Sequence, residues 1–392
     1  MQRAVPFNKP FIAGKELFYV AQAVTLGNIS GDGHFTQRCS RLLEERFGIQ
    51  RVLLTPSCTA ALEMAVLLAG VAPGDEVILP SFTFVSTANA VMRAGATPVF
   101  VDIRQDTLNL DEAACEAAVT ERTRAIIPVH YAGVACAMDR VLEIARQHGL
   151  EVIEDAAQGV NAFHNEQALG AIAPLGAYSF HETKNYTCGE GGALCVNAEK
   201  YVERAEILRD KGTNRSKFLR GEVDKYTWVD VGSSYVPSEI VSAFLFGQLE
   251  MLEPIAARRR EIDAGYRERL APLEAAGHLA LPVVPEGCQS NHHMFYVLLP
   301  DAATRDALLD YLRGRGIGAS FHYVPLHTSP MGEQLGWREG SLPITEAMSG
   351  RLARLPFYYE INSDDQDYVA ETMSSFFRES AARRPAKQPL ST

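Results

Sequence analysis

Between about residues 50 and 210, short apolar or β-branched runs alternate with helical patterns, and this alternation limits the possible folds more than any other feature. It is typical of a mostly parallel sheet covered by helices. Ligands of open α/β sheets bind beyond the carboxyl ends of the strands, so the residues that follow each strand are the first functional candidates. The expected strands are Val52–Thr55, Glu76–Leu79, Pro98–Val101, Ala125–Val129, Glu151–Glu154, Ala177–Phe180 and Gly192–Val196.

Helical patterns set the expected organisation around this sheet. Apolar residues from Met138 to Ala145 recur at i, i+3, i+4 and i+7, which predicts an amphipathic helix that ends near Gly149. A long helical stretch from about Ser238 to Leu270 predicts the connection to a second domain. The expected parts are a large domain over 1–245, a small C-terminal α+β domain over 246–378 with a strand at Met294–Leu299 and a helix at Ala303–Arg313, and a disordered tail over 379–392.

Composition excludes several classes of protein. With 37 basic and 48 acidic residues, the net charge of −11 argues against nucleic-acid and anionic-membrane partners. No apolar stretch approaches the roughly 20 residues that span a bilayer, and the N-terminus lacks the apolar core of a signal peptide. Seven scattered cysteines without CxxC spacing and histidines without zinc spacing predict neither disulfides nor a metal site. We therefore expect a cytoplasmic protein.

The segment Ser57–Leu62 follows the first expected strand and opens a helix. Unpaired N–H groups at a helix N-terminus, together with the hydroxyls of this segment, can hold a phosphate. Ser and Thr also cap helices without binding a ligand, and this alternative stays open from these residues alone. The segment has neither GxxxxGK[ST] nor GxGxxG spacing, which disfavours a P-loop and a Rossmann dinucleotide site.

Two charged residues follow other strands at the same expected edge of the sheet. Asp155 ends the fifth expected strand and is placed to pair with a pyridinium nitrogen, which makes such a ring an electron sink; a helix-capping Asp is the alternative. Lys184 follows the strand Ala177–Phe180, where a partly buried amine with a depressed pKa can form a Schiff base. A single loop lysine is usually a solvated surface charge, but its combination with Asp155 and the 57–62 turn is much rarer.

An aromatic residue and a glycine group complete the pattern. Phe82 or Phe84, after the second expected strand, can stack on a flat ring or belong to the core, and we favour Phe84 for the stacking role. Gly189, Gly191 and Gly192 allow either a tight active-site turn or a simple turn into the next strand.

With these residues assembled, the chain resembles the sugar-nucleotide aminotransferases, a family of enzymes that use pyridoxal 5′-phosphate (PLP), over about residues 4 to 375. The resemblance implies the fold type I of PLP-dependent transferases, with a large α/β domain and a small C-terminal α+β domain. It rests on SCTAAL at 57–62, PSFTFVSTANA at 80–90, EDAAQ at 154–158, SFHETKN at 179–185, GEGG at 189–192 and HYVPLH at 322–327.

The resemblance assigns roles to single residues. It implies that Lys184 is the catalytic residue, which carries PLP as a Schiff base and moves protons, and that Asp155 binds the pyridine nitrogen. It also implies that Gln158 lies near the ring hydroxyl and that Phe84 stacks on the ring. The implied phosphate contacts within the chain are Cys58, Thr59 and Ser179.

The resemblance further implies a homodimer with shared active sites, and leaves open any larger oligomer. Many family members have Asn and Arg in the loop that crosses from the partner toward the phosphate, where this chain has Ser234 and Val236. We keep Ser234 as the candidate phosphate contact and expect the exchange to alter specificity more than catalysis. The candidate contacts to the sugar nucleotide are Ser30, Arg215, Tyr226, His322 and His327.

A narrower likeness concerns the substrate. The stretch FLRGEVDKYTWVDVGSSY at 218–235 is most similar to bacterial transaminases that convert dTDP-4-dehydro-6-deoxy-D-glucose to dTDP-4-amino-4,6-dideoxy-D-galactose, with glutamate as amino donor. Lys184 separates the chain from related sugar dehydratases, which carry a histidine there. Amination at C3, formation of the C4 epimer and a non-catalytic regulatory role are the alternatives.

Overall fold

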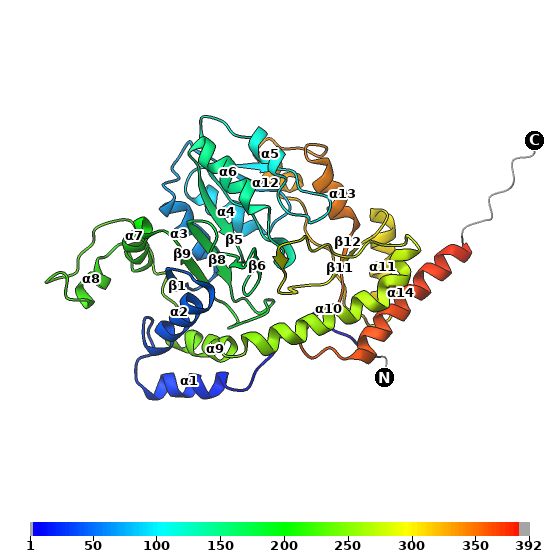
Figure 1. Cartoon of the computed structure of the whole chain (residues 1–392), viewed down its shortest axis with the longest axis horizontal. Coiled ribbons are helices and arrows are strands. Elements are labelled where there is room, and N and C mark those ends of the chain that lie inside the picture. The colour runs from blue at the N-terminus through cyan, green and yellow to red at the C-terminus, as the bar shows by residue number, and fades with distance from the viewer. Residues whose placement is uncertain (1–2, 384–392) are drawn as a thin grey trace, which may run out of the picture.

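A seven-stranded, mostly parallel sheet lies at the centre of residues 3–383, the part of the chain that the computed structural model describes (Figure 1). Its strands are β1 (Arg51–Thr55), β2 (Glu76–Pro80), β3 (Thr97–Val101), β4 (Thr123–Ile126), β5 (Glu151–Asp155), β8 (Leu175–Ser179) and β9 (Gly192–Val196). The strand order is β1-β9-β8-β5-β4-β2-β3. Within this sheet β9 is antiparallel to both neighbours, β1 and β8, whereas the other adjacent pairs are parallel.

Helices cover both faces of the sheet, as a parallel sheet requires. Alternate residues of a strand enter different hydrophobic clusters: in β2, Val77 and Leu79 belong to one cluster and Ile78 to another. One face is covered by α3 (Cys58–Leu68), α4 (Val85–Arg93) and α7 (Glu199–Arg209). The other face is covered by α2 (His34–Phe47), α5 (Glu112–Ala117), α6 (Met138–His148) and α9 (Glu239–Leu249).

The α/β fold expected from the sequence is confirmed, with small shifts of the strand ends. The largest shift is in β4, which ends at Ile126 rather than Val129 because Pro128 has no N–H to donate to a ladder. The chain rejoins the sheet at Val129, which forms a bridge to Asp155. Helix α6 ends as predicted at Gly149, whose φ of 67° is left-handed and suits glycine.

The single long helix expected over Ser238–Leu270 is wrong, because the structure has two helices, α9 and α10 (Leu252–Ala275), bent by 59°. Pro254 explains the break: it cannot donate a hydrogen bond to the carbonyl of Glu250, and its ring clashes there. In the first turn of α10 the missing N–H is harmless. No single helix among residues 3–383 is long and apolar enough to cross a membrane, although the bent α9–α10 pair meets that length and composition together.

The C-terminal part has a hydrophobic cluster of its own. Val5 belongs to this cluster and forms a bridge to Ile317, so the N-terminal segment packs against the C-terminal part. Figure 1 shows the described N-terminal end beside α14. The domain bounds 1–245 and 246–378 stay predictions. This part contains α11 (Ala302–Arg313), α12 (Pro330–Gln334), α13 (Pro343–Arg351), α14 (Ser363–Arg383) and the antiparallel pair β11 (Tyr296–Leu298) and β12 (Leu352–Arg354).

The disordered tail predicted over 379–392 is wrong for its first residues, because α14 continues to Arg383. Alanine and arginine favour helix, and the Tyr311 hydroxyl donates to Glu379 Oε1 at 2.6 Å. Residues 384–392 lie outside the described residues. The remaining elements are α1 (Glu16–Thr25), α8 (Arg215–Leu219), short strands β6 (Phe163–His164), β7 (Gln167–Ala168) and β10 (Cys288–Gln289), and 3-10 turns at Tyr131–Gly133 and Leu326–Thr328.

Candidate active site

A cavity of about 440 Å³ opens at the carboxyl ends of β5 and β8 and at the N-terminus of α3. Its floor therefore comes from the large sheet, while residues of the C-terminal part, such as Tyr323, form another wall. This is the sheet edge that the sequence indicated as the ligand site. The predicted site residues that line the cavity are Cys58, Thr59, Phe84, Asp155, Gln158, Ser179, Lys184 and His322.

Asp155, the last residue of β5, presents a buried carboxylate to the cavity and is 4% exposed. The Thr87 hydroxyl donates to Asp155 Oδ2 at 2.7 Å, and the Ala157 N–H donates to Oδ1 at 3.1 Å. These two donors fix the orientation of a group that, when ionised, only accepts hydrogen bonds. Such a carboxylate is suited to a cationic ring N–H.

Lys184 lies in the turn after β8, where its backbone N–H donates to the His181 carbonyl at 2.9 Å. The side chain is half-buried and lines the cavity. Burial lowers the pKa of Lys184, while Cys58 and Asp155 oppose that shift. Within residues 3–383 the lysine amine has no hydrogen-bond or ion-pair partner, so it is available for a covalent bond to a ligand.

The N-terminus of α3 forms the anion-binding wall of the cavity. The Ser57 hydroxyl accepts from the Ala60 N–H at 3.1 Å, whereas the N–H groups of Cys58 and Thr59 have no acceptor within the helix. Burial raises the pKa of the Cys58 thiol well above its usual value, so the thiol stays neutral beside an anion. A Cβ on Gly192 would lie 2.4 Å from the Cys58 nitrogen, which explains the glycine in β9.

Phe82 and Phe84, the two aromatic residues considered for stacking, occupy different environments. Phe82 is 1% exposed in a hydrophobic cluster, whereas Phe84 lines the cavity and is 59% exposed. Gln158 also lines the cavity; its amide N–H donates to the Tyr323 hydroxyl at 3.0 Å, and its oxygen accepts from the Ala132 N–H at 2.7 Å. Their contacts to a bound ring stay predictions.

Several polar residues of the cavity were not predicted, among them His293, Tyr323 and Arg354. Tyr323 lies inside the motif at 322–327, so a signal for it existed. His293 lies in a His-His pair without zinc spacing, for which packing or a substrate contact was expected, and Arg354 belongs to no motif. Burial lowers the pKa of His293 well below its ordinary value and lowers the pKa of His322 to about 2. Both rings are therefore neutral at physiological pH.

His327 does not reach the cavity, in contrast to its expected role as a substrate contact. The side chain is fully buried, and both ring nitrogens have partners: Nδ1 lies 2.7 Å from Ser81 Oγ, and Nε2 lies 2.8 Å from Glu346 Oε1. The histidine thus connects the segment that precedes Phe84 to the C-terminal part. We correct its role from substrate contact to structural support.

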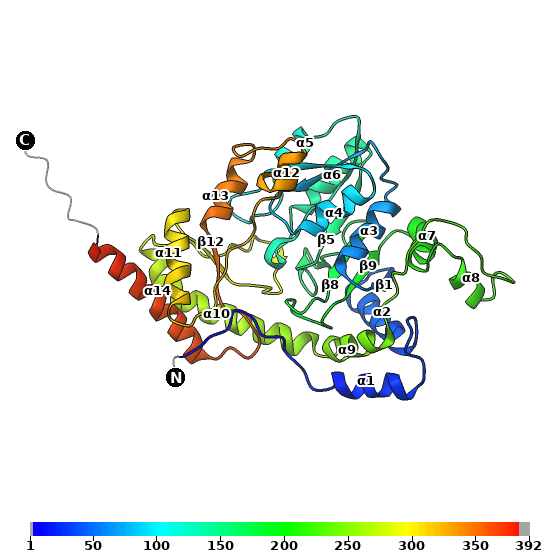
Figure 2. The ribbon, with the colours of Figure 1, turned by 180° about the vertical axis from the view of Figure 1, so that it is seen from behind.

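Four predicted residues do not line the cavity within the described chain: Ser30, Arg215, Tyr226 and Ser234. Arg215 is partly exposed and pairs with Asp210 at 3.3 Å, and the other three side chains are exposed. Both views of the molecule show α8 and its neighbouring loop projecting from the body (Figure 1, Figure 2). Their assignment to substrate or phosphate binding stays a prediction.

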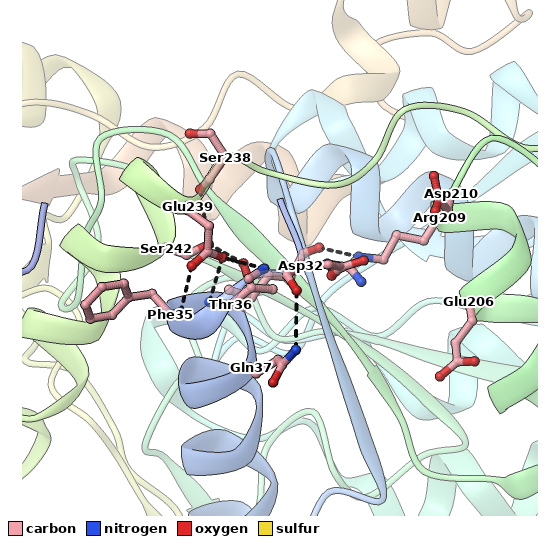
Figure 3. A network of polar contacts seen from close by, with 12 residues as sticks. Asp32, Phe35, Thr36, Gln37, Glu206, Arg209, Asp210, Ser238, Glu239 and Ser242 are labelled. Carbon is pink, nitrogen blue, oxygen red and sulfur yellow. Dashed lines mark hydrogen bonds and ion pairs between the residues drawn. The ribbon is translucent and has the colours of Figure 1, made fainter. Parts of the chain in front are cut away.

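A buried polar network lies between the start of α2, next to the loop that carries Ser30, and the end of α7 (Figure 3). Glu239 is 1% exposed, and its carboxylate accepts three backbone N–H groups at the start of α2 at 2.7 to 3.0 Å, a favourable place for a negative charge. Arg209 pairs with Asp32 at 2.6 Å. A Cβ on Gly31 would lie 2.0 Å from Val236 Cγ1. The loop that carries Ser30 is therefore held against the segment that carries Ser234.

Comparison with known proteins identifies the family. The sequence model of the DegT/DnrJ/EryC1/StrS aminotransferase family matches residues 10–374. The chain belongs to this family. It is 34% identical over 378 residues to the spore coat polysaccharide biosynthesis protein SpsC of Bacillus subtilis (strain 168), covering 94% of this chain and 96% of SpsC.

Two further similarities support this DegT/DnrJ/EryC1/StrS assignment. A pleiotropic regulatory protein of Geobacillus stearothermophilus is 38% identical over 320 residues, which are 81% of this chain and 82% of that protein. The PLP form of Spr1654 from Streptococcus pneumoniae superposes with a TM-score of 0.89 at 25% identity, covering 96% of this chain and 99% of Spr1654. The chain is thus a PLP-dependent sugar aminotransferase.

The residues of this DegT/DnrJ/EryC1/StrS enzyme fit PLP. The free N–H groups of α3 suit the cofactor phosphate, the oriented Asp155 carboxylate suits the ring nitrogen, and the unpartnered Lys184 amine suits the aldehyde carbon. All three lie on the same cavity.

Proposed function

We propose that this sugar aminotransferase transfers the amino group of L-glutamate to C4 of dTDP-4-dehydro-6-deoxy-D-glucose. The products are dTDP-4-amino-4,6-dideoxy-D-galactose and 2-oxoglutarate. The observation that carries the amino transfer is the unpartnered Lys184 amine in one cavity with the buried Asp155 carboxylate. The likeness at 218–235 supports the choice of sugar, and the name of B. subtilis SpsC supports a role in polysaccharide biosynthesis.

PLP, when bound, supplies an electron sink that stabilises negative charge at the reacting carbon. Lys184 holds the cofactor and, once released, takes a proton from the donor carbon and returns one to the product carbon. Its lowered pKa favours the neutral amine that this role requires. Asp155, oriented by Thr87 and by the Ala157 N–H, keeps the ring nitrogen protonated.

The proposal includes a homodimer in which each partner completes the other's site. Apolar side chains on the projecting segment support it: Leu219, Trp228 and Val231 are 65%, 78% and 65% exposed, and exposed apolar groups of this kind mark contact surfaces. Arg215 and Tyr226 lie on the same segment and would face the partner's sugar nucleotide. All seven cysteines are free thiols, which agrees with a cytoplasmic location.

The experiment is a turnover assay with L-glutamate and dTDP-4-dehydro-6-deoxy-D-glucose, with the configuration of the product determined by NMR. We expect an axial amine at C4, as in the galactose series, and a loss of at least about 10³-fold in Lys184→Ala, because the proton transfer is lost. Lys200→Ala is the control, since Lys200 is exposed and pairs with Glu151. A normal rate in Lys184→Ala refutes the assignment; a C3 or equatorial amine corrects only the substrate and product.

A second candidate is a non-catalytic regulatory protein that binds PLP, and the name of the G. stearothermophilus relative favours it. The joint presence of Lys184, Asp155 and Ser179 on the cavity opposes it, because a regulator does not need a complete catalytic set. Conversion of the keto sugar by the purified protein excludes this role. Full PLP loading without any response to glutamate supports it.

A further inference from the structure

Arg354, the last residue of β12, lines the cavity, and within residues 3–383 its guanidinium has no hydrogen-bond acceptor or ion-pair partner. Among residues 3–383 it forms no side-chain hydrogen bond and no ion pair, and its Nε is buried without an acceptor. A buried charged donor without an acceptor is costly to the fold. Its position is therefore best explained by a ligand that supplies the acceptor.

A second buried arginine shows how the same fold normally satisfies this group. Arg259 is 6% exposed, and its guanidinium lies 4.7 Å from the centre of the Phe357 ring. Its Nε and Nη2 donate to the carbonyls of His292 and His293 at 2.9 and 2.6 Å. Arg354 has a comparable ring contact, 4.7 Å from the centre of Phe7, but no such acceptors. Its donors are thus left for the cavity.

The chemistry of the missing partner follows from the guanidinium. Arginine stays protonated at neutral pH and presents a planar fork of N–H groups that matches a carboxylate or a phosphate. The N-terminus of α3, a helix that covers the large sheet, already offers a binding wall for phosphate. Arg354 comes from the C-terminal part, and its charge helps to lower the pKa of Lys184, for which burial is the main cause. An anion close to the reacting amine is therefore the better fit.

We propose that Arg354 binds a carboxylate of the amino donor and so selects an acidic amino acid over neutral amines. The inference rests on the proposed use of glutamate. It makes Arg354 a specificity residue for the first half of the reaction: the donor and 2-oxoglutarate both carry carboxylates, whereas the keto sugar does not. In the second half reaction, the keto sugar therefore forms no ion pair with Arg354.

The test compares binding and half reactions of Arg354→Gln and Arg354→Lys with the unchanged protein. Equilibrium binding of glutarate, a dicarboxylate that cannot react, to the PLP-loaded protein should weaken about 10- to 100-fold in Arg354→Gln, as expected for a lost charged hydrogen bond. Arg354→Lys should recover part of the lost glutarate affinity. Affinity for dTDP should change less than about twofold. Arg3→Gln is the control, since Arg3 lies over Tyr368 and pairs with Asp365 away from the cavity.

Amide analogues of the donor identify the carboxylate. The visible absorbance change on mixing with glutamate, glutamine or glutamate α-amide reports the first half reaction alone. The effect of Arg354→Gln should vanish for the analogue whose amide replaces the contacted carboxylate, because the two changes remove one interaction. If Arg354→Gln does not fold, Arg354→Lys and the analogue selectivity of the unchanged protein still decide.

Three results would overturn the inference: unchanged glutarate affinity in Arg354→Gln, weakened dTDP binding in its place, or equal use of glutamate and both amides by the unchanged protein. A failure of the proposed function looks different. There the unchanged, PLP-loaded protein shows no absorbance change with glutamate at all.

Discussion

The cavity wall built by the large sheet and the projecting segment around α8 carry the two halves of the predicted site, and among the described residues only the first half lines the cavity. Asp155 ends β5 and is buried, and the half-buried Lys184 lies in the turn after β8; both line one cavity. Tyr226 and Ser234 are exposed and line no part of that space. The difference suggests a division of labour in which a single chain builds the cofactor chemistry and a second copy supplies part of the substrate recognition.

The two halves also differ in what fixes them. The sheet ladder sets the positions of β5 and β8, so the residues after them share one edge. The projecting segment joins the body where Arg209 pairs with Asp32 (Figure 3). Along α8 it is held by side-chain ion pairs, Arg220 with Glu206 and Lys217 with Glu203. Changes in the first half should therefore act on chemistry within a chain, and changes in the second should act between chains.

The largest expected effect is that of Asp155→Asn on the first half. Loss of the carboxylate removes the charge that keeps the ring nitrogen protonated, and we expect the single-turnover rate with glutamate to fall about 10²- to 10³-fold. Stopped-flow absorbance measures this rate. Asp139→Asn is the control, because the Asp139 side chain is 85% exposed. A rate within twofold of the unchanged protein would contradict the role of Asp155.

The division between chains is tested by mixing two inactive variants. Lys184→Ala lacks the catalytic amine, and the double variant Arg215→Ala/Tyr226→Ala lacks the proposed substrate contacts; we expect the latter to retain a few per cent of activity or less. Refolded or co-expressed together, the two should recover about a quarter of normal activity, because half of the dimers then hold one intact site. A mixture whose activity does not exceed that of the two separate variants would contradict shared sites.

A smaller effect is expected at Thr87, whose hydroxyl donates to Asp155 but which does not itself line the cavity. Thr87→Val removes a hydrogen bond to a charged group, and we expect the turnover rate to fall about 10-fold. Thr87→Ser retains the hydroxyl and should recover most of the rate. If Val and Ser variants lose activity equally, packing rather than orientation of the carboxylate explains the effect.

The smallest effect is the pH dependence of stability that comes from His322, which lies on the cavity wall formed by the C-terminal part. The pKa of His322 is about 2 in the fold and near 6.5 when unfolded, so between these values the unfolded chain binds the extra proton. The contribution of the neutral His322 to the free energy of unfolding should therefore be fully present above pH 6.5. It should fall on acidification by at most about 1.4 kcal/mol per pH unit. His322→Asn should show a smaller drop in Tm between pH 7 and 5 than His148→Asn, whose histidine is exposed. Equal drops would contradict a neutral, buried His322.

The sequence predicted the half of the site that follows from strand order. Lys184, Asp155 and the 57–62 turn could be placed together because each follows a strand of one parallel sheet. His327 could not be placed, since the motif at 322–327 does not show which side chains face the cavity. One of its contacts, Ser81, lies far away in the sequence, and the other, Glu346, lies on the following helix α13.

Other features were not predicted from the sequence, for different physical reasons. Arg354 ends a three-residue strand whose partner is β11, and an unpaired guanidinium can be recognised only once its surroundings are known. The break between α9 and α10 did have a signal, Pro254, because proline excludes a continuous helix. The exposed state of Tyr226 on the projecting segment is a property of the tertiary structure, which no local pattern encodes.

Locating the cofactor on the chain is the most direct test of the role of Lys184. The PLP-loaded protein should be yellow, and reduction with borohydride should fix the cofactor irreversibly to one amine. After proteolysis, mass spectrometry should find the added mass on the peptide that contains Lys184, and prior incubation with glutamate should prevent the labelling. Labelling of another lysine, or labelling that glutamate does not prevent, would contradict the central claim that the Lys184 amine holds PLP and yields it to the amino donor.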